Sequence, residues 1–124
     1  MIHIKEIVGM DGMMNKLTKT KLNEIYLLGE NRTGKPIFID FYADWWGPCK
    51  MFEQVLNEVT SEYQDRIEMY KVNIEDEPAI AQQFGVRSIP FMVMISKSGV
   101  REPHVGSLDK DTLKYYFEGL LRKK

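Results

Sequence analysis

The sequence of 124 residues is poor in the side chains that build disulfide frameworks and metal sites. It has one cysteine, Cys49, and two histidines, His3 and His104. A single cysteine excludes an intramolecular disulfide, so a packed core must hold the fold together. The two histidines are far apart in sequence, and neither stands at zinc-ligand spacing from Cys49. We therefore expect no metal site, and nothing in the sequence indicates a cofactor.

The chain also lacks an excess of charge of one sign and a long apolar run. Seventeen Lys and Arg against eighteen Asp and Glu give a formal net charge of -1, without the basic surface that nucleic acids and anionic lipids select. No apolar run approaches the roughly 20 residues that span a bilayer, and Lys5 and Glu6 interrupt any signal-peptide core. We expect no nucleic-acid or membrane partner. As written, the sequence suggests a cytoplasmic protein, and it would be periplasmic if Met1 followed a removed signal.

Hydrophobic residues make up 44% of the chain, which is enough for one domain, residues 1–124, with its own core. Residues 1–35 have the weakest pattern. Ile2 and Ile4 suggest a short strand, and a helix should follow, on an apolar stripe ending before the Gly- and Pro-containing loop of residues 31–36. That stripe consists of Met14, Leu17, Ile25 and Leu28.

The pattern sharpens after Pro36. Residues 37–42 form an almost continuous apolar run that predicts a strand buried on both faces, with Asp40 as its one charged member. After Gly47 and Pro48 the period changes to that of an amphipathic helix, and Pro48 suits the first turn of such a helix. The helical stripe consists of Phe52, Val55, Leu56, Val59 and Tyr63.

The second half alternates in the same way. A strand is predicted over residues 67–74, a short helix over 77–84 closed by Gly85, and a hairpin of 91–95 and 100–105 around a turn at 96–99. The last helix follows Gly106 on a stripe of Leu113, Tyr116, Phe117, Leu120 and Leu121. The order β-α-β-α-β-α-β-β-α predicts an α/β fold with a mixed sheet.

One segment carries the functional argument. Trp45-Trp46-Gly47-Pro48-Cys49-Lys50 stands where the buried strand meets the long helix, and it resembles the thioredoxin family, whose signature is Trp-Cys-Gly-Pro-Cys at such a junction. The resemblance extends over residues 37–121 and includes Asp40, residues 71–75, residues 85–90 and Gly106. It implies the thioredoxin fold, with helices on both faces of a central mixed sheet, and protein-disulfide oxidoreductase activity in cell redox homeostasis. It also implies protein substrates and, for an active parent, a thioredoxin reductase as partners.

The departure from the family pattern is as informative as the match. Trp46 occupies the position of the nucleophilic cysteine. Dithiol chemistry needs a thiolate to attack a substrate disulfide and a second thiol to resolve the mixed disulfide, and an indole does neither. Cys49 is then either an inert buried thiol or a slow monothiol. A helix N-terminus favours its thiolate, and burial opposes it.

The resemblance also assigns roles to other residues. Asp40 corresponds to the buried acid that relays protons to the second cysteine, with Lys71 as its charge partner. Without the reaction, Asp40 is alternatively a satisfied buried carboxylate. Ile89 and Pro90 match the family's cis-proline loop, although an ordinary X-Pro turn would have the same sequence. The implied peptide groove consists of Trp45, Gly47, Pro48, Ile89, Pro90 and Gly106, to which Trp46 adds an exposed aromatic ring.

Two functions follow from these observations. The chain is either an oxidoreductase scaffold whose nucleophile was replaced, naturally or by substitution, or a binding module that keeps the groove and has discarded catalysis. In both cases we expect no dithiol reductase activity from the chain as written. The two differ in whether restoring a cysteine at Trp46 restores turnover.

Overall fold

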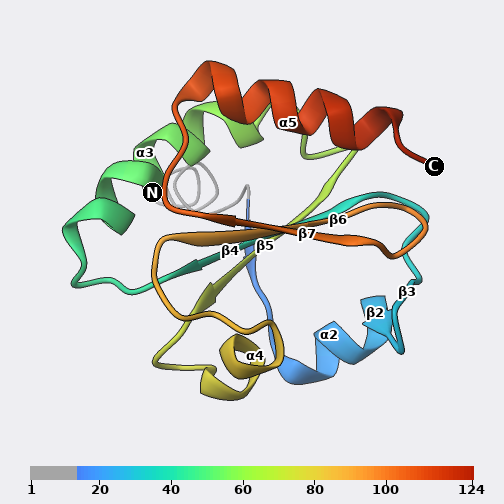
Figure 1. Ribbon diagram of the computed structural model, residues 1–124, viewed down its shortest axis with the longest axis horizontal. Coiled ribbons are helices and arrows are strands. Elements are labelled where there is room, and N and C mark those ends of the chain that lie inside the picture. Colours follow the sequence, from blue (N-terminus) through green and yellow to red (C-terminus); the bar gives the residue numbers. More distant parts are fainter. Residues whose placement is uncertain (1–13) are drawn as a thin grey trace, which may run out of the picture.

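The computed structural model describes residues 14–124, and its central feature is a five-stranded sheet (Figure 1). The strand order is β1-β5-β4-β6-β7. β4 pairs in parallel with β5, and β5 in parallel with β1, whereas β4–β6 and β6–β7 are antiparallel. The bounds are β1 Asn15–Lys16, β4 Ile37–Tyr42, β5 Glu68–Asn73, β6 Phe91–Ile95 and β7 Arg101–Val105. The strand predicted at Ile2 and Ile4 lies outside the described residues.

Helices cover both faces of this sheet. α3 (Gly47–Thr60) and α5 (Lys110–Arg122) lie on one face, and α2 (Lys19–Ile25) and α4 (Pro78–Gln83) lie on the other (Figure 1). The predicted α/β class, with a mixed sheet between two helical layers, is therefore confirmed. The last helix begins at the N-cap Asp109, whose carboxylate accepts a hydrogen bond from the Thr112 N–H at 2.8 Å.

The alternation of side chains along β4 divides the core into two clusters and determines where Asp40 points. Ile37, Ile39 and Phe41 belong to the cluster that includes α2 and α4 residues, whereas Phe38 packs with residues of α3 and α5. Because successive side chains of a strand point to opposite faces, Asp40 lies on the Phe38 side, beneath α3. The buried acid and the N-terminal turn of α3 thus share one face of the sheet.

The N-terminal region differs from the predicted single helix. The helix ends at Ile25, and a two-stranded hairpin of β2 (Tyr26–Leu27) and β3 (Glu30–Asn31) follows. Leu28, expected on the buried stripe, is 96% exposed in the hairpin turn, where its φ is 53° and that of Gly29 is 77°. Two successive positive φ angles are typical of a type I′ turn. The dipeptide Leu-Gly predicts such a turn much less strongly than Asn-Gly does.

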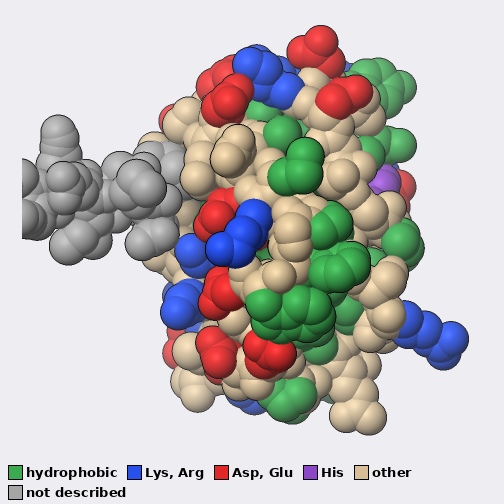
Figure 2. Space-filling view, turned by 90° about the vertical axis from the view of Figure 1, so that its left-hand side faces the viewer, with side chains coloured by type: hydrophobic (Ala, Val, Ile, Leu, Met, Phe, Trp, Pro, Cys, Tyr) green, Lys and Arg blue, Asp and Glu red, His purple; other side chains and the backbone are tan. Residues whose placement is uncertain are grey.

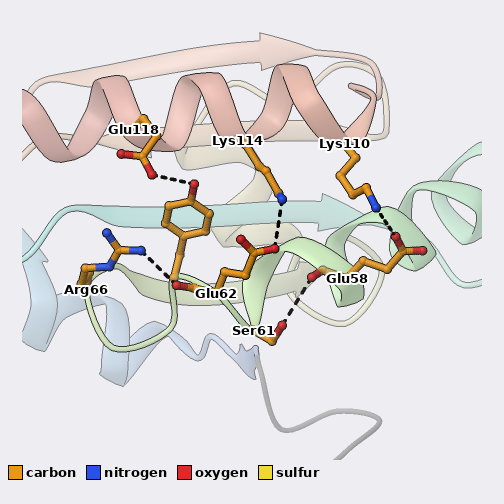
Figure 3. Close-up of polar contacts among 8 residues, drawn as sticks. Glu58, Ser61, Glu62, Arg66, Lys110, Lys114 and Glu118 are labelled. Carbon is orange, nitrogen blue, oxygen red and sulfur yellow. Dashed lines mark hydrogen bonds and ion pairs between the residues drawn. The ribbon is translucent and has the colours of Figure 1, made fainter.

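The end of α3 is a second, smaller correction. The helix ends at Thr60, so Tyr63 lies in the following turn, although it is only 4% exposed and belongs to the core as predicted. Its hydroxyl donates to Glu118 of α5 at 2.7 Å (Figure 3). Two ion pairs lie beside this bond: Lys110–Glu58 joins α5 to α3, and Lys114–Glu62 joins α5 to the turn after α3. Exposed ion pairs of this kind contribute about 1 kcal/mol or less each, so packing dominates the contact between α3 and α5.

Within residues 14–124, no helix combines the length and apolar character that a membrane-spanning segment needs.

Candidate functional site at the strand–helix junction

The candidate site is the turn between β4 and α3, at the left end of the sheet in Figure 1. Trp46 is the N-cap residue of α3, with extended backbone and no side-chain cap. Its carbonyl oxygen accepts from the N–H groups of Cys49 and Lys50 at 3.0 and 3.2 Å, and Pro48 occupies the first turn, where its missing N–H costs nothing. Gly47 and Pro48 are exposed, whereas Cys49 faces inward.

Cys49 is shielded from solvent, with 5% of its surface exposed. Burial raises the pKa of its thiol above the usual value, and the charge of Asp40 raises it further, against the lowering effect of a hydrogen bond with the Ala43 backbone. Burial therefore outweighs the favourable position at the helix N-terminus. The thiolate, which is the reactive form, is disfavoured at neutral pH.

Asp40 and Cys49 line one cavity of about 80 Å³, which also reaches Lys71 of β5 and Glu53 of α3. Asp40 is 7% exposed, and no group within residues 14–124 hydrogen-bonds to its Oδ1 atom. Burial, followed by the negative charge of Glu53, raises the pKa of Asp40 to about 7, while the charge of Lys71 lowers it. The structure thus brings the predicted acid, cation and thiol together around one small polar space.

Glu53 is a member of this cavity that the sequence analysis missed. It follows Cys49 by four residues on α3, so both side chains face the same side of the helix. Its effect on the pKa of Asp40 is larger than that of Lys71, although Asp40 and Lys71 are direct neighbours across β4 and β5. The helical spacing from Cys49 was the signal that would have identified it.

The two tryptophans form the exposed side of the junction. Trp46 is 40% exposed and Trp45 is 63% exposed, and their rings meet edge to face with centroids 5.7 Å apart. The Trp46 indole N–H donates to the carbonyl oxygen of Ile89 at 3.1 Å, and the Trp45 indole N–H donates to Glu75 at 2.9 Å. The expected exposure of Trp46 beside a buried Cys49 agrees with the structure, and each indole has a defined hydrogen-bond partner.

The other residues predicted for the groove come from two loops: the half-buried Ile89 and the buried Pro90 precede β6, and Gly106 follows β7. The Ile89–Pro90 peptide bond is cis, and the Pro90 carbonyl oxygen accepts from the Gly106 N–H at 2.9 Å. Gly106 has a φ of 89°, a conformation that favours glycine. Because Trp46 and Gly106 bond to the successive carbonyl groups of Ile89 and Pro90, both acceptors are satisfied within the chain.

Comparison with known proteins identifies the family. The Thioredoxin family model matches residues 14–118. The chain belongs to the thioredoxin family. It is 43% identical to thioredoxin 1 of Synechococcus elongatus over 79 residues, which are 63% of this chain and 73% of that protein. It is 37% identical to a chloroplastic M-type thioredoxin of Brassica napus over 82 residues, and spans 46% of that protein's length. A mutant thioredoxin from Halobacterium salinarum NRC-1 superposes with a TM-score of 0.72 at 27% identity, covering 90% of this chain and 92% of that one.

Family membership confirms the thioredoxin fold and places the chain among proteins of thiol-disulfide exchange, which act on protein substrates and are served by thioredoxin reductase. The chain keeps the family's Gly-Pro-Cys but has a single cysteine. Within residues 14–124, no cluster of three or more His, Cys, Asp or Glu side chains is arranged to hold a metal ion.

Proposed function

We propose that this chain binds extended segments of other proteins without a covalent step and does not catalyse dithiol-disulfide exchange. The observation that carries the proposal is the pair of positions Trp46 and Cys49. The family's nucleophilic position holds an indole that bonds to Ile89, and the remaining thiol is 5% exposed.

The chemistry of exchange explains why one buried thiol is insufficient. A thiolate attacks a substrate disulfide, forms a mixed disulfide and releases one substrate thiolate. A second thiol then attacks that mixed disulfide, releases the reduced substrate and leaves an intramolecular disulfide. Cys49 lacks both the exposure for the first step and a partner for the second. For the same reason, the chain forms no internal disulfide that a thioredoxin reductase would reduce.

The exposed side of the junction supports the binding role. Trp45, Trp46 and the loop of Ile89 and Pro90 are linked by ring contacts and hydrogen bonds, which orient the two large aromatic side chains at the surface. Exposed, oriented tryptophans are common anchors of protein interfaces. Because the Ile89 and Pro90 carbonyl groups are already occupied, we propose that a partner segment is held mainly by side-chain contacts with the indoles.

The loss of catalysis is tested with two variants at one position. Reduction of insulin, with dithiothreitol as electron source, is measured for the native chain, Trp46→Cys and Trp46→Ser. We expect turnover above the dithiothreitol background only for Trp46→Cys, with Trp46→Ser showing that removing the indole is not enough. Turnover by the native chain would contradict the proposal, because Cys49 would then be a reactive monothiol. Inactivity of Trp46→Cys would mean that the catalytic scaffold has been lost along with its nucleophile.

The binding role is tested by NMR titration with a nine-residue peptide, acetylated and amidated, that has two central apolar residues. The chain has two tryptophans, so its indole N–H signals report directly on the proposed surface. We expect saturable shifts of both signals, unchanged in Cys49→Ser because no covalent bond forms. Absence of any shift would contradict the binding role.

A further inference from the structure

Four acidic residues lie in the two turns that meet at Trp45, and one of them, Glu75, accepts a hydrogen bond from its indole. Asp44 precedes Trp45 in the β4–α3 turn, and Glu75, Asp76 and Glu77 follow β5. The two turns are tied together by Asn73, whose amide nitrogen donates to Asp44 at 3.3 Å and whose amide oxygen accepts from the Glu75 N–H at 2.8 Å. We call Trp45 with these four residues the acidic tryptophan surface.

The carboxylates of this surface have no basic partner among residues 14–124. The ion pairs in that part of the chain join other residues, Lys21–Glu24, Lys110–Glu58, Lys114–Glu62 and Lys123–Glu102. Lys50 and Arg87 are exposed on α3 and in the loop after α4, and neither forms an ion pair with the four acids. No ion pair with a basic side chain of the described residues therefore neutralises these four acids.

Figure 2 shows the face that contains the junction. Apolar side chains form a band across it, and acidic side chains lie beside the lower end of the band, with basic side chains close by. The negative charge of Asp44 also affects Tyr42, a neighbouring half-buried residue. Burial, followed by the charges of Asp44 and then Asp40, raises the pKa of Tyr42 to about 12.

We infer that the acidic tryptophan surface binds an arginine side chain of a partner protein segment, next to an apolar residue of that segment that contacts Trp46. This deepens the proposed function and rests on it. A guanidinium group stacks on an indole face and pairs with carboxylates in the same plane, a combination that a lysine ammonium reproduces less well. Trp45 is 63% exposed, and its hydrogen bond to Glu75 holds the ring beside a carboxylate. The exposed ring and a carboxylate at its edge are thus held together before any partner arrives.

The test uses three peptides that differ in one residue. Each contains the same two central apolar residues, followed by arginine, by citrulline as its neutral isostere, or by glutamate. We measure the dissociation constant of each from the indole N–H shifts of the native chain at low salt. We expect the arginine peptide to bind about fivefold to tenfold more tightly than the citrulline peptide, and the glutamate peptide to bind most weakly. The advantage of arginine should shrink as salt screens the charges.

Two double variants separate a local effect from overall charge. Glu75→Gln with Asp76→Asn removes two charges from the turn that bonds to Trp45 and keeps an amide oxygen at residue 75 to accept from the indole. Glu30→Gln with Asp65→Asn removes two exposed charges at β3 and in the turn after α3, toward the other end of the sheet (Figure 1). We expect the first pair to abolish the preference for arginine over citrulline and the control pair to preserve it.

Equal binding of the three peptides, or equal losses in the two double variants, would overturn the inference while leaving the binding role intact. Failure of every peptide to bind would overturn the binding role together with it.

Discussion

The buried and exposed sides of the β4–α3 junction have changed to different extents. Inside, Asp40, Lys71 and Cys49 line one cavity, as an active family member would need them to. Outside, the indole of Trp46 stands at the position of the family's nucleophilic thiol, and its N–H donates a hydrogen bond to the Ile89 carbonyl oxygen. Under the proposed function, one residue of the outer surface removes the chemistry, whereas the interior keeps the residues that the family resemblance assigns to it.

The difference has an energetic consequence. A carboxylic acid whose Oδ1 atom has no partner within residues 14–124, and whose pKa is raised by burial, destabilises the folded state whenever it is ionised. A binding surface made of Trp45 and Trp46 does not need that acid. The interior thus keeps a destabilising group, whereas the exposed side has gained aromatic contacts.

Replacing the interior acid should give the largest effect on stability. The pKa of Asp40 is raised from 3.8 to about 7 in the folded state, so this state binds more protons than the unfolded state between those values. Stability from this group is complete below about pH 4 and is lost as pH rises through about 7. We expect Asp40→Asn to be more stable than the native chain by the order of 4 kcal/mol at pH 8, with a much smaller gain at pH 4.

Urea unfolding of both proteins between pH 4 and pH 8 measures this difference, with exposed Asp65→Asn as the control. A gain that does not grow with pH would mean that Asp40 has partners in the folded protein that satisfy its ionised form.

The shielding of Cys49 predicts the next effect in size. Its thiol is 5% exposed and has a raised pKa, so alkylation requires both local opening and ionisation. We therefore expect iodoacetamide to react with the native protein at pH 8 at least about a hundredfold more slowly than with the protein in guanidinium chloride. Each tenfold in this ratio corresponds to about 1.4 kcal/mol of free energy for exposing and ionising the thiol. Mass spectrometry gives both rates. Similar rates would revive the monothiol interpretation of Cys49.

The fold after Pro36 could be predicted closely from the sequence because its patterns are long and unambiguous. The apolar runs at Ile37–Tyr42 and Phe91–Ile95 have the bounds of β4 and β6. The N-terminal region could not be predicted in the same way. Leu28 fits a helical stripe by its spacing, yet it lies in a hairpin turn. Such a turn is defined by the positive φ angles of its residues, which leave no periodic signal in the sequence.

For the site, sequence reasoning identified most residues of the junction, though not Glu53, and it did not predict how they bond. The cavity shared by Asp40, Cys49 and Lys71 follows from strand and helix periods combined with the family motif. The bonds of Trp46 to Ile89 and of Trp45 to Glu75 join residues 43 and 30 positions apart. Such contacts depend on side-chain rotamers and on the packing of distant loops, for which a single sequence has no periodic signal.

Restoring the nucleophile links the two sides of the junction. In Trp46→Cys, the interior acid regains a reaction to assist, so adding Asp40→Asn should lower the rate of insulin reduction at pH 7 by about tenfold or more. The same double variant should remain more stable than Trp46→Cys at pH 8. A rate loss combined with a stability gain would show that the interior is still arranged for proton transfer. An unchanged rate would mean that Asp40 now has only a structural role.

The smallest effect distinguishes the two indoles. Trp46→Phe keeps an aromatic ring beside Trp45 but leaves the half-buried Ile89 carbonyl group without its donor, which should cost about 1 kcal/mol of unfolding free energy. Trp45→Phe removes a bond to the exposed Glu75, which water replaces, so its cost should be about half as large. Urea titrations of the two variants under one set of conditions measure the order. If Trp45→Phe were the more costly change, the more exposed indole would be the structural one, and Trp46 would be freer to move away from Ile89 when a partner segment binds.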